Sequence, residues 1–144
     1  MTALFGEYRH KVDAKGRLTL PSPFRKALTE ETQLVVVPST KNEFLSVYTA
    51  EGFEAWVDAL FEKRGGFNPS DRMHVLARTK LNASAVSSSM DSVGRINLAS
   101  KQRELAGLDK DVVLIGNTAP FEIWDAKRWD EFQSSIDLDA LLFS

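Results

Sequence analysis

A five-residue motif occurs twice in the chain, and this repetition constrains the fold more than any other feature of the sequence. The first copy is Asp13-Ala14-Lys15-Gly16-Arg17, and the second is Asp91-Ser92-Val93-Gly94-Arg95. An Asp side chain can close a turn, and a Gly can adopt the positive φ that other residues resist. Apolar and polar residues alternate on both sides of the first copy, so the pattern predicts a β-hairpin between residues 8–12 and 18–20.

The repeat extends well beyond the two turns. At a constant offset of 78 residues, eight residues of the first half recur unchanged in the second half. Asp13, Gly16, Arg17, Leu20, Ser22, Arg25, Val35 and Thr40 match Asp91, Gly94, Arg95, Leu98, Ser100, Arg103, Val113 and Thr118. This pattern indicates an internal duplication. Because each half alone would bury only a small share of its surface, the two halves are expected to interleave and share one core.

The other elements are expected in the same order in both halves. In the first half, the sequence predicts a short helix that begins at Ser22, a second hairpin over 33–37 and 44–48, and an amphipathic helix opened by Thr49 or Glu51. The apolar stripe of that helix comprises Phe53, Trp56, Val57, Leu60 and Phe61. In the second half, we expect a short helix over 100–105, a hairpin over 112–115 and 121–124, and a helix capped by Asp125 with Trp129, Phe132 and Ile136 turned inward.

A connector is predicted between the repeats. We expect a first repeat over residues 1–64, a connector helix over 65–80 and a second repeat over 81–144, with Asn68 as the N-cap of the connector helix. The polar run 84–89 is expected to be the edge arm of the hairpin around the second turn. The tail, residues 138–143, is apolar enough to dock on a protein surface.

The charge of the chain is unevenly distributed. The chain has 144 residues and a net charge of −2, yet residues 1–28 carry a net charge of +4 and residues 120–144 a net charge of −4. A phosphate backbone responds to charges within about 10 Å at moderate salt. A basic face can therefore bind nucleic acid although the whole chain is acidic.

The arginines of the two turns are the first candidates for contact with DNA. Arg17 and Arg95 each follow a glycine turn, and a guanidinium can bind two acceptors of a guanine or a phosphate at once. Asp13 and Asp91 lie across the turns and could orient these arginines. An alternative stays open, in which the motif is only favourable hairpin chemistry that the fold needs twice.

Three further basic residues lie near the first turn. Arg9 and Lys11 alternate onto one face of the strand, and Lys15 lies at the tip of the turn, so a basic two-stranded ribbon results. Such a ribbon fits the major groove. The alternative is an edge strand whose charges prevent aggregation. His10, one residue out of phase, is expected to pack or to hydrogen-bond on the other face.

Several classes of function find no support in the sequence. The chain has no cysteine, so disulfides, zinc–thiolate sites and thiol catalysis are excluded. The two histidines lack the spacing of metal ligands, and His74 is expected to be a surface or packing residue. No phosphate loop, nucleophile elbow or metal-binding helix motif is present, so we expect no enzyme, no cofactor and no small-molecule substrate. The longest apolar run is too short for a membrane span, and the first residues do not form a signal peptide, which predicts a cytoplasmic protein.

The combined motifs resemble a known family. Two stretches together resemble the MraZ transcriptional regulators. The first runs from Phe5-Gly6 through the first turn to Pro21 and on to Phe24-Arg25, and the second is the repeated Asp-x-x-Gly-Arg. The resemblance implies a β-rich α+β fold of two swapped-hairpin, AbrB-like halves, related by a pseudo-twofold axis, with a β-barrel-like core and flanking helices. One departure is that Pro21 is matched by Ala99 in the second half.

The same resemblance implies a function. MraZ proteins bind double-stranded DNA at short repeats in the promoter of a cell-division and cell-wall gene cluster that includes their own gene, and they form ring-shaped homo-oligomers on the nucleoid. The DNA-binding residues would be Arg17, Lys15, Asp13, Gly16, Arg9, Lys11, Arg95, Asp91 and Gly94. Two alternatives remain, an AbrB-like antitoxin and an oligomeric structural module that binds no DNA.

Overall fold

The chain folds into antiparallel sheets flanked by helices. The computed structural model describes residues 4–117 and 120–143, so Thr118 of the repeat and the first three residues lie outside the described part. The strands are β1 (Gly6–Lys11), β2 (Arg17–Thr19), β3 (Leu34–Pro38), β4 (Leu45–Thr49), β5 (Val86–Ser88), β6 (Arg95–Asn97), β7 (Asp111–Gly116) and β8 (Phe121–Asp125). The helices are α1 (Ser22–Ala27), α2 (Ala50–Glu62), α3 (Arg72–Ser84), α4 (Ser100–Leu105), α5 (Ala126–Ser135) and α6 (Leu138–Phe143). The expected α+β class is confirmed.

The larger sheet is assembled from both halves of the chain. Its strand order is β1-β7-β8-β4-β3-β5, and every pair is antiparallel. The first strand of each half therefore pairs with a strand of the other half: β1 with β7, and β5 with β3. The halves interleave as expected, and β5 is the edge strand that the polar run predicted. The second hairpins, β3–β4 and β7–β8, are also confirmed.

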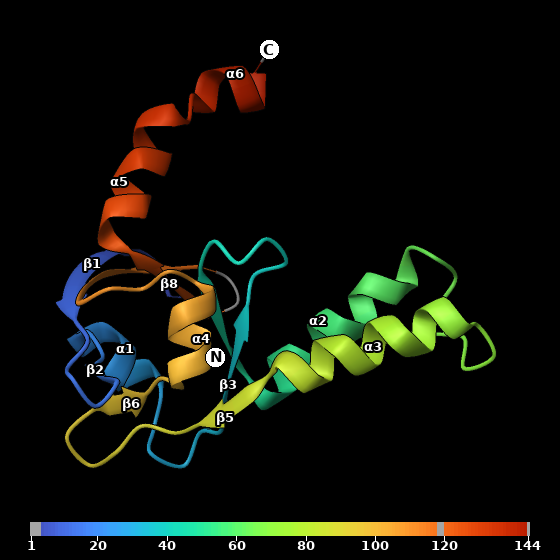
Figure 1. Cartoon of the computed structure of the whole chain (residues 1–144), viewed down its shortest axis with the longest axis horizontal. Coiled ribbons are helices and arrows are strands. Elements are labelled where there is room, and N and C mark those ends of the chain that lie inside the picture. Colours follow the sequence, from blue (N-terminus) through green and yellow to red (C-terminus); the bar gives the residue numbers. More distant parts are fainter. Residues whose placement is uncertain (1–3, 118–119, 144) are drawn as a thin grey trace.

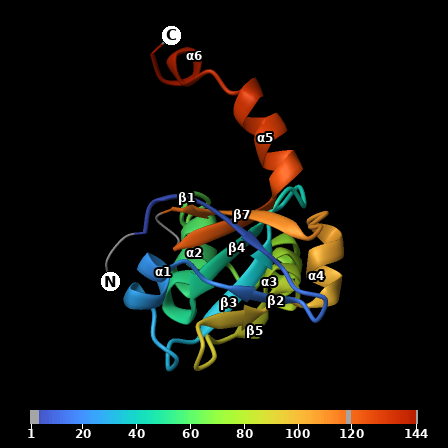
Figure 2. The same ribbon diagram turned by 90° about the vertical axis from the view of Figure 1, so that its left-hand side faces the viewer.

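The remaining two strands form a separate ribbon. β2 pairs only with β6, and Leu18 lies opposite Ile96 at the centre of the pair. These two residues are related by the offset of 78, so the register of the ribbon is symmetric about the midpoint between them. Figure 2 looks toward the side of the molecule that carries β1, β2 and α1.

Three expectations about these strands are wrong. The predicted hairpin between 8–12 and 18–20 is reduced to a single bridge, Val12 to Leu18, because β1 continues along β7 while β2 turns away to β6. The predicted hairpin around the second turn is not formed either, because β5 pairs with β3 and β6 pairs with β2. A closed barrel is not found in the described residues either, because the larger sheet ends at β1 and β5 and the β2–β6 ribbon covers the sheet instead of extending it.

The main core lies between the larger sheet and the β2–β6 ribbon. Leu18 and Ile96 point inward from the ribbon, and Phe24 of α1 packs edge-on against Tyr8 and tilted against Phe121, with ring centroids 5.3 and 5.0 Å apart. Both halves supply this core. Because the core needs β2 and β6 together, the two motif turns are held at one end of the molecule.

Helices α2 and α3 form a hairpin that extends away from the sheets (Figure 1). Of the predicted stripe, Phe53, Val57 and Phe61 are buried, whereas Leu60 is exposed and Trp56 is half-buried. Phe53, Val57 and Phe61 form a second cluster with Val35, Val37 and Tyr48, and Trp56 packs against it. Thr49 caps α2 by accepting from the Gly52 N–H, as expected.

The connector helix begins later than predicted. Its N-cap is Asp71 and not Asn68. The Asp71 carboxylate accepts from the N–H groups of Met73 and His74, whereas the Asn68 side chain closes a turn by accepting from the Ser70 N–H. Both residues are good caps, but only Asp71 lies directly before the helix. The helix also continues to Ser84, beyond the predicted end at residue 80. The domain boundaries themselves stay a prediction.

The C-terminal helices leave the body of the protein. Asp125 caps α5 as predicted, and Trp129 and Phe132 of α5 pack against Trp124 of β8. Figure 1 shows α5 and α6 extending away from the sheets and from the α2–α3 hairpin.

Candidate nucleic-acid interface

In the first motif turn, one carboxylate organises the whole loop. Asp13 Oδ1 accepts hydrogen bonds from the N–H groups of Lys15 and Arg17, both at 2.9 Å, and Asp13 Oδ2 accepts from Arg17 Nε at 2.8 Å. Gly16 has a φ of +83°, which side-chain-bearing residues rarely adopt. The hydrogen bond from the Arg17 N–H, aided by the Arg17 side chain and the Lys15 N–H, lowers the pKa of Asp13.

The second turn repeats this geometry. Asp91 Oδ1 accepts from the N–H groups of Val93 and Arg95 at 3.0 and 2.8 Å, and Asp91 Oδ2 accepts from Arg95 Nε at 2.9 Å. The Arg95 N–H is again the main cause of the lowered pKa of Asp91. Asp13 and Asp91 therefore orient the arginines, as the sequence predicted.

Both arginines keep their outer edge available. Their side chains are 37% and 34% exposed for Arg17 and Arg95, and each guanidinium contacts its aspartate through Nε. Within residues 4–117 and 120–143, neither guanidinium makes a hydrogen bond through its η nitrogens. The side of the fork that can bind two acceptors is thus presented to solvent.

The two arginines lie on the same face of the β2–β6 ribbon. Leu18 and Ile96 point inward, so their neighbours Arg17 and Arg95 point outward. In this register the two arginines are diagonal neighbours across the strands, a separation of roughly 7–8 Å that long side chains can bridge. The turns therefore form one surface and not two.

Sequence reasoning missed two arginines that hold these turns. Arg103 lies over Gly16 and donates from Nε to the carbonyl oxygen of Leu98 at 3.2 Å, while the Leu98 N–H donates to the Gly16 carbonyl oxygen at 2.8 Å. Arg25 lies over Gly94 in the equivalent place. Each turn is thus covered by an arginine of the other half. The recurrence of Arg25 as Arg103 was visible in the sequence, but their placement depends on the exchange of strands.

The basic residues of β1 lie elsewhere. Arg9 and Lys11 share the exposed face of β1, as predicted, but β1 belongs to the edge of the larger sheet. Arg9 donates to Asp130 at 2.7 Å and to Glu7 at 3.3 Å, and the hydrogen bond to Asp130 raises the pKa of Arg9. Lys11 lies 4.0 Å from Asp111. Acidic partners therefore offset both charges, and the predicted basic ribbon is not formed by β1. His10 is half-buried on the opposite face of β1.

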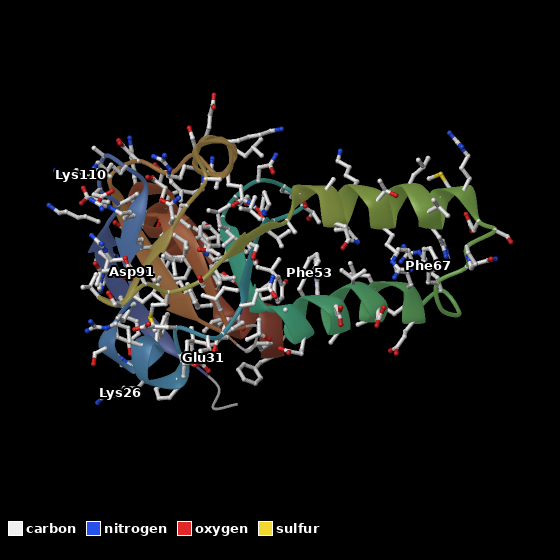
Figure 3. All side chains as sticks on the ribbon, turned by 90° about the horizontal axis from the view of Figure 1, so that it is seen from below. Lys26, Glu31, Phe53, Phe67, Asp91 and Lys110 are labelled. Atoms are coloured by element: carbon white, nitrogen blue, oxygen red, sulfur yellow. The ribbon has the colours of Figure 1, made fainter. Side chains whose placement is uncertain are left out.

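The tips of the two turns differ. Lys15 is exposed at the tip of the first turn, whereas Val93, 57% exposed, takes the equivalent place in the second. Figure 3 shows Asp91 at the same end of the molecule as Lys26 and Lys110, and at the opposite end from Phe67 in the α2–α3 loop. The two turns thus share one end of the molecule.

The described ranges contain no metal centre and no membrane-spanning helix. No group of three or more His, Asp or Glu side chains there is placed to hold a metal ion. None of the helices in those ranges combines the length and the apolar character that crossing a bilayer requires. His74 lies half-buried between Phe61 and Phe67, as a packing residue does.

Comparison with known proteins gives consistent matches along the whole chain. A family model described as "MraZ protein, putative antitoxin-like" matches residues 3–76 and 81–140. A protein of Corynebacterium urealyticum named transcriptional regulator MraZ is 38% identical over 136 residues, which are 94% of this chain and 90% of the relative. Proteins of the same name from Mycolicibacterium gilvum and Acetivibrio thermocellus are 37% and 33% identical, over 90% and 94% of this chain and 85% and 90% of the relatives. The chain belongs to the MraZ family.

Proposed function

We propose that this protein is a transcriptional regulator that binds specific sequences of double-stranded DNA through the β2–β6 ribbon and its two turns. The observation that carries this proposal is the pair of half-exposed guanidiniums, Arg17 and Arg95, on one face of the ribbon, each held at Nε by an aspartate. The relatives named as transcriptional regulators support it.

The geometry fits recognition of guanine. Since Nε is engaged by Asp13 or Asp91, the η nitrogens of each arginine are left to donate to O6 and N7 of a guanine in the major groove. A side chain held in this way loses little rotamer freedom on binding. Gly16 and Gly94 shape the turns, and Lys15 supplies a phosphate contact at the tip of the first turn.

Arg25 and Arg103 add positive charge beside the turns, so they join the proposed interface. Arg9 and Lys11 are weaker candidates because their charges are already paired with Asp130, Glu7 and Asp111. They would act at most on neighbouring phosphates.

The fold and the assembly complete the proposal. The exchange of β1 and β5 between the halves is the pairing expected of two swapped-hairpin, AbrB-like units. A ring-shaped homo-oligomer would place several ribbons on one duplex, and linked sites raise the effective concentration of each contact. The proposed targets are short repeats in the promoter of a cell-division and cell-wall gene cluster that includes the protein's own gene, which places the protein in the cytoplasm, on the nucleoid.

A binding titration across salt concentrations tests this function. The upstream region of the gene is titrated with the wild type, with Arg17→Ala, with Arg95→Ala and with the double variant. Each engaged arginine is expected to contribute roughly 1 to 3 kcal/mol to specific binding. Arg64→Ala is the matched control, because Arg64 lies at the far end of α2 and donates to the Leu60 carbonyl oxygen. Unchanged affinity of the double variant at matched salt would contradict the proposal.

An AbrB-like antitoxin is the second candidate, favoured by the words "antitoxin-like" in the description of the matching family model. Stable co-purification with a small partner toxin, together with loss of its toxicity, would favour this candidate. A structural module would show neither toxin binding nor salt-dependent affinity for DNA.

A further inference from the structure

We infer that the C-terminal helix α6 of one copy docks in a groove between α2, α3 and α4 of a second copy. This inference specifies the homo-oligomer of the proposed function and rests on it.

The tail presents an apolar surface that this chain does not cover. Leu138, Leu141, Leu142 and Phe143 are between 63% and 79% exposed, and the described residues of α6 include no buried side chain. A cluster of this kind in water is unfavourable, at about 25 cal/mol for each Å² of apolar surface left exposed. Covering the tail with another apolar surface would therefore be favourable.

The body of the protein offers a groove of matching character. It has a volume of about 600 Å³, and its apolar lining includes Trp56 of α2, Leu81 of α3 and Leu105 of α4. Leu105 is exposed although it is a large apolar residue. Like the tail, the groove has apolar surface that the described chain leaves uncovered.

The charges on the two surfaces are complementary. Lys80 and Lys101 line the groove, and neither forms an ion pair within the described ranges. The tail carries Asp137 and Asp139; Asp137 also accepts from the Ala140 N–H at the start of α6. Because Asp139 is exposed and forms no ion pair in the same ranges, it can approach these lysines. This match favours the tail over an unrelated apolar partner.

The occupant has to come from another copy. Figure 1 shows α5 and α6 extending away from the sheets. The groove lies between α2, α3 and α4, on the body of the protein. The anchoring of α5 by Trp124, Trp129 and Phe132 fixes the direction in which the tail leaves. A tail that points away from its own body and a groove on the body would form a heterologous contact between copies, which closes into a ring when it is repeated with the right rotation.

Engineered cysteines test the contact directly because the natural chain has none. Leu105→Cys is placed in a tagged copy and Leu141→Cys in an untagged copy, and the two proteins are mixed and oxidised. The expected product is the mixed disulfide dimer, separated by its mass from either homodimer. Glu31→Cys replaces Leu105→Cys in the control pairing, because Glu31 lies on the body near α1, away from the groove (Figure 3).

Three outcomes would overturn the inference. They are a disulfide mainly between two Leu141→Cys copies, an intrachain disulfide in a monomer that carries both Leu105→Cys and Leu141→Cys, and cross-linking no stronger than with Glu31→Cys. A wild type that is monomeric at micromolar concentration in sedimentation measurements would overturn it as well.

Charge exchange provides an independent test. Lys101→Glu and Asp139→Lys are each expected to raise the concentration of half-dissociation roughly fivefold at low salt, and the two together are expected to restore assembly. Lack of restoration would contradict the pairing. These variants should still bind DNA, although more weakly, and should lose that binding when Arg17→Ala is added. Such a result distinguishes failure of this contact from failure of the proposed function.

Discussion

Arg103 of the second half lies directly over Gly16 of the first half, and the backbone of Leu98 joins them. Leu98 accepts from Arg103 Nε and donates to the Gly16 carbonyl oxygen. Arg25 likewise lies over Gly94, and the Leu20 N–H donates to the Gly94 carbonyl oxygen. Neither turn is therefore a local structure. Each depends on residues about 80 positions away, so the two turns are expected to lose their shape together.

Replacing the two turn glycines is predicted to have unequal effects. A Cβ at Gly16 would lie 2.8 Å from the Leu98 carbonyl oxygen, which belongs to the backbone and cannot move aside, whereas at Gly94 it would meet the aliphatic part of the Arg25 side chain, which can. Both changes also strain a positive φ, at a cost of about 1–3 kcal/mol each. In urea unfolding, Gly16→Ala should be the more destabilising variant.

Gly65→Ala is the matched control for these glycines. Gly65 also has a positive φ, of +84°, but an added Cβ would meet no atom within 4 Å. The Gly65→Ala variant therefore reports only the backbone strain of a positive φ. If Gly16→Ala is no more destabilising than Gly65→Ala, the close contact with Leu98 is not rigid.

The two turn aspartates predict a loss of stability in acid. The pKa values of Asp13 and Asp91 are lowered in the folded protein, mainly by the N–H groups of Arg17 and Arg95. The unfolded chain therefore binds more protons near the ordinary pKa of Asp, and the stabilisation present above this value is lost as the pH falls through the folded pKa. The free energy of unfolding should be nearly constant above about pH 5 and decrease below it.

The double variant Asp13→Asn, Asp91→Asn tests the origin of this loss. Its free energy of unfolding should depend less on pH in the acid range, measured by urea unfolding at a series of pH values. Asp130, whose pKa is lowered by the hydrogen bond from Arg9, should account for part of what remains. An unchanged pH dependence would show that the turn carboxylates are not responsible.

The unequal turn tips predict a gain of affinity. Val93 is exposed where the first turn carries Lys15, so Val93→Lys restores the missing charge without disturbing the core. The variant should bind DNA more tightly at low salt, and the slope of log affinity against log salt should become steeper by about one. Val75→Lys on α3 is the control for added charge alone, because Val75 is also exposed but lies outside the proposed interface. An equal gain for both variants would place Val93 outside the interface.

The sequence contained the hydrogen-bonding chemistry within each turn. The spacing of Asp13, Gly16 and Arg17 predicted a glycine turn with the aspartate bonded to the arginine, and the structure confirms both features. The second hairpins and the cap of α5 by Asp125 follow from local patterns too, because turn and cap preferences act over a few residues.

The pairing of distant strands could not be predicted in this way. Periodicity shows which face of β1 is polar, but not that β1 pairs with β7 instead of β2, since both partners satisfy the same alternation. The pairing of Arg9 with Asp130 and the cover of Gly16 by Arg103 both follow from that exchange, so they were missed as well. Asn68 and Asp71 are comparable caps, and only the backbone path of the loop selects Asp71.

Removal of the guanine N7 acceptor tests whether Arg17 and Arg95 bind guanine. The upstream region is prepared with 7-deazaguanine in place of guanine, and its affinity for the wild type and for Arg17→Ala, Arg95→Ala is measured at one salt concentration. The account predicts that the wild type loses roughly 1 to 3 kcal/mol for each guanine contact, whereas the double variant is insensitive to the modified base. Equal losses for the two proteins would contradict the reading of guanine by Arg17 and Arg95.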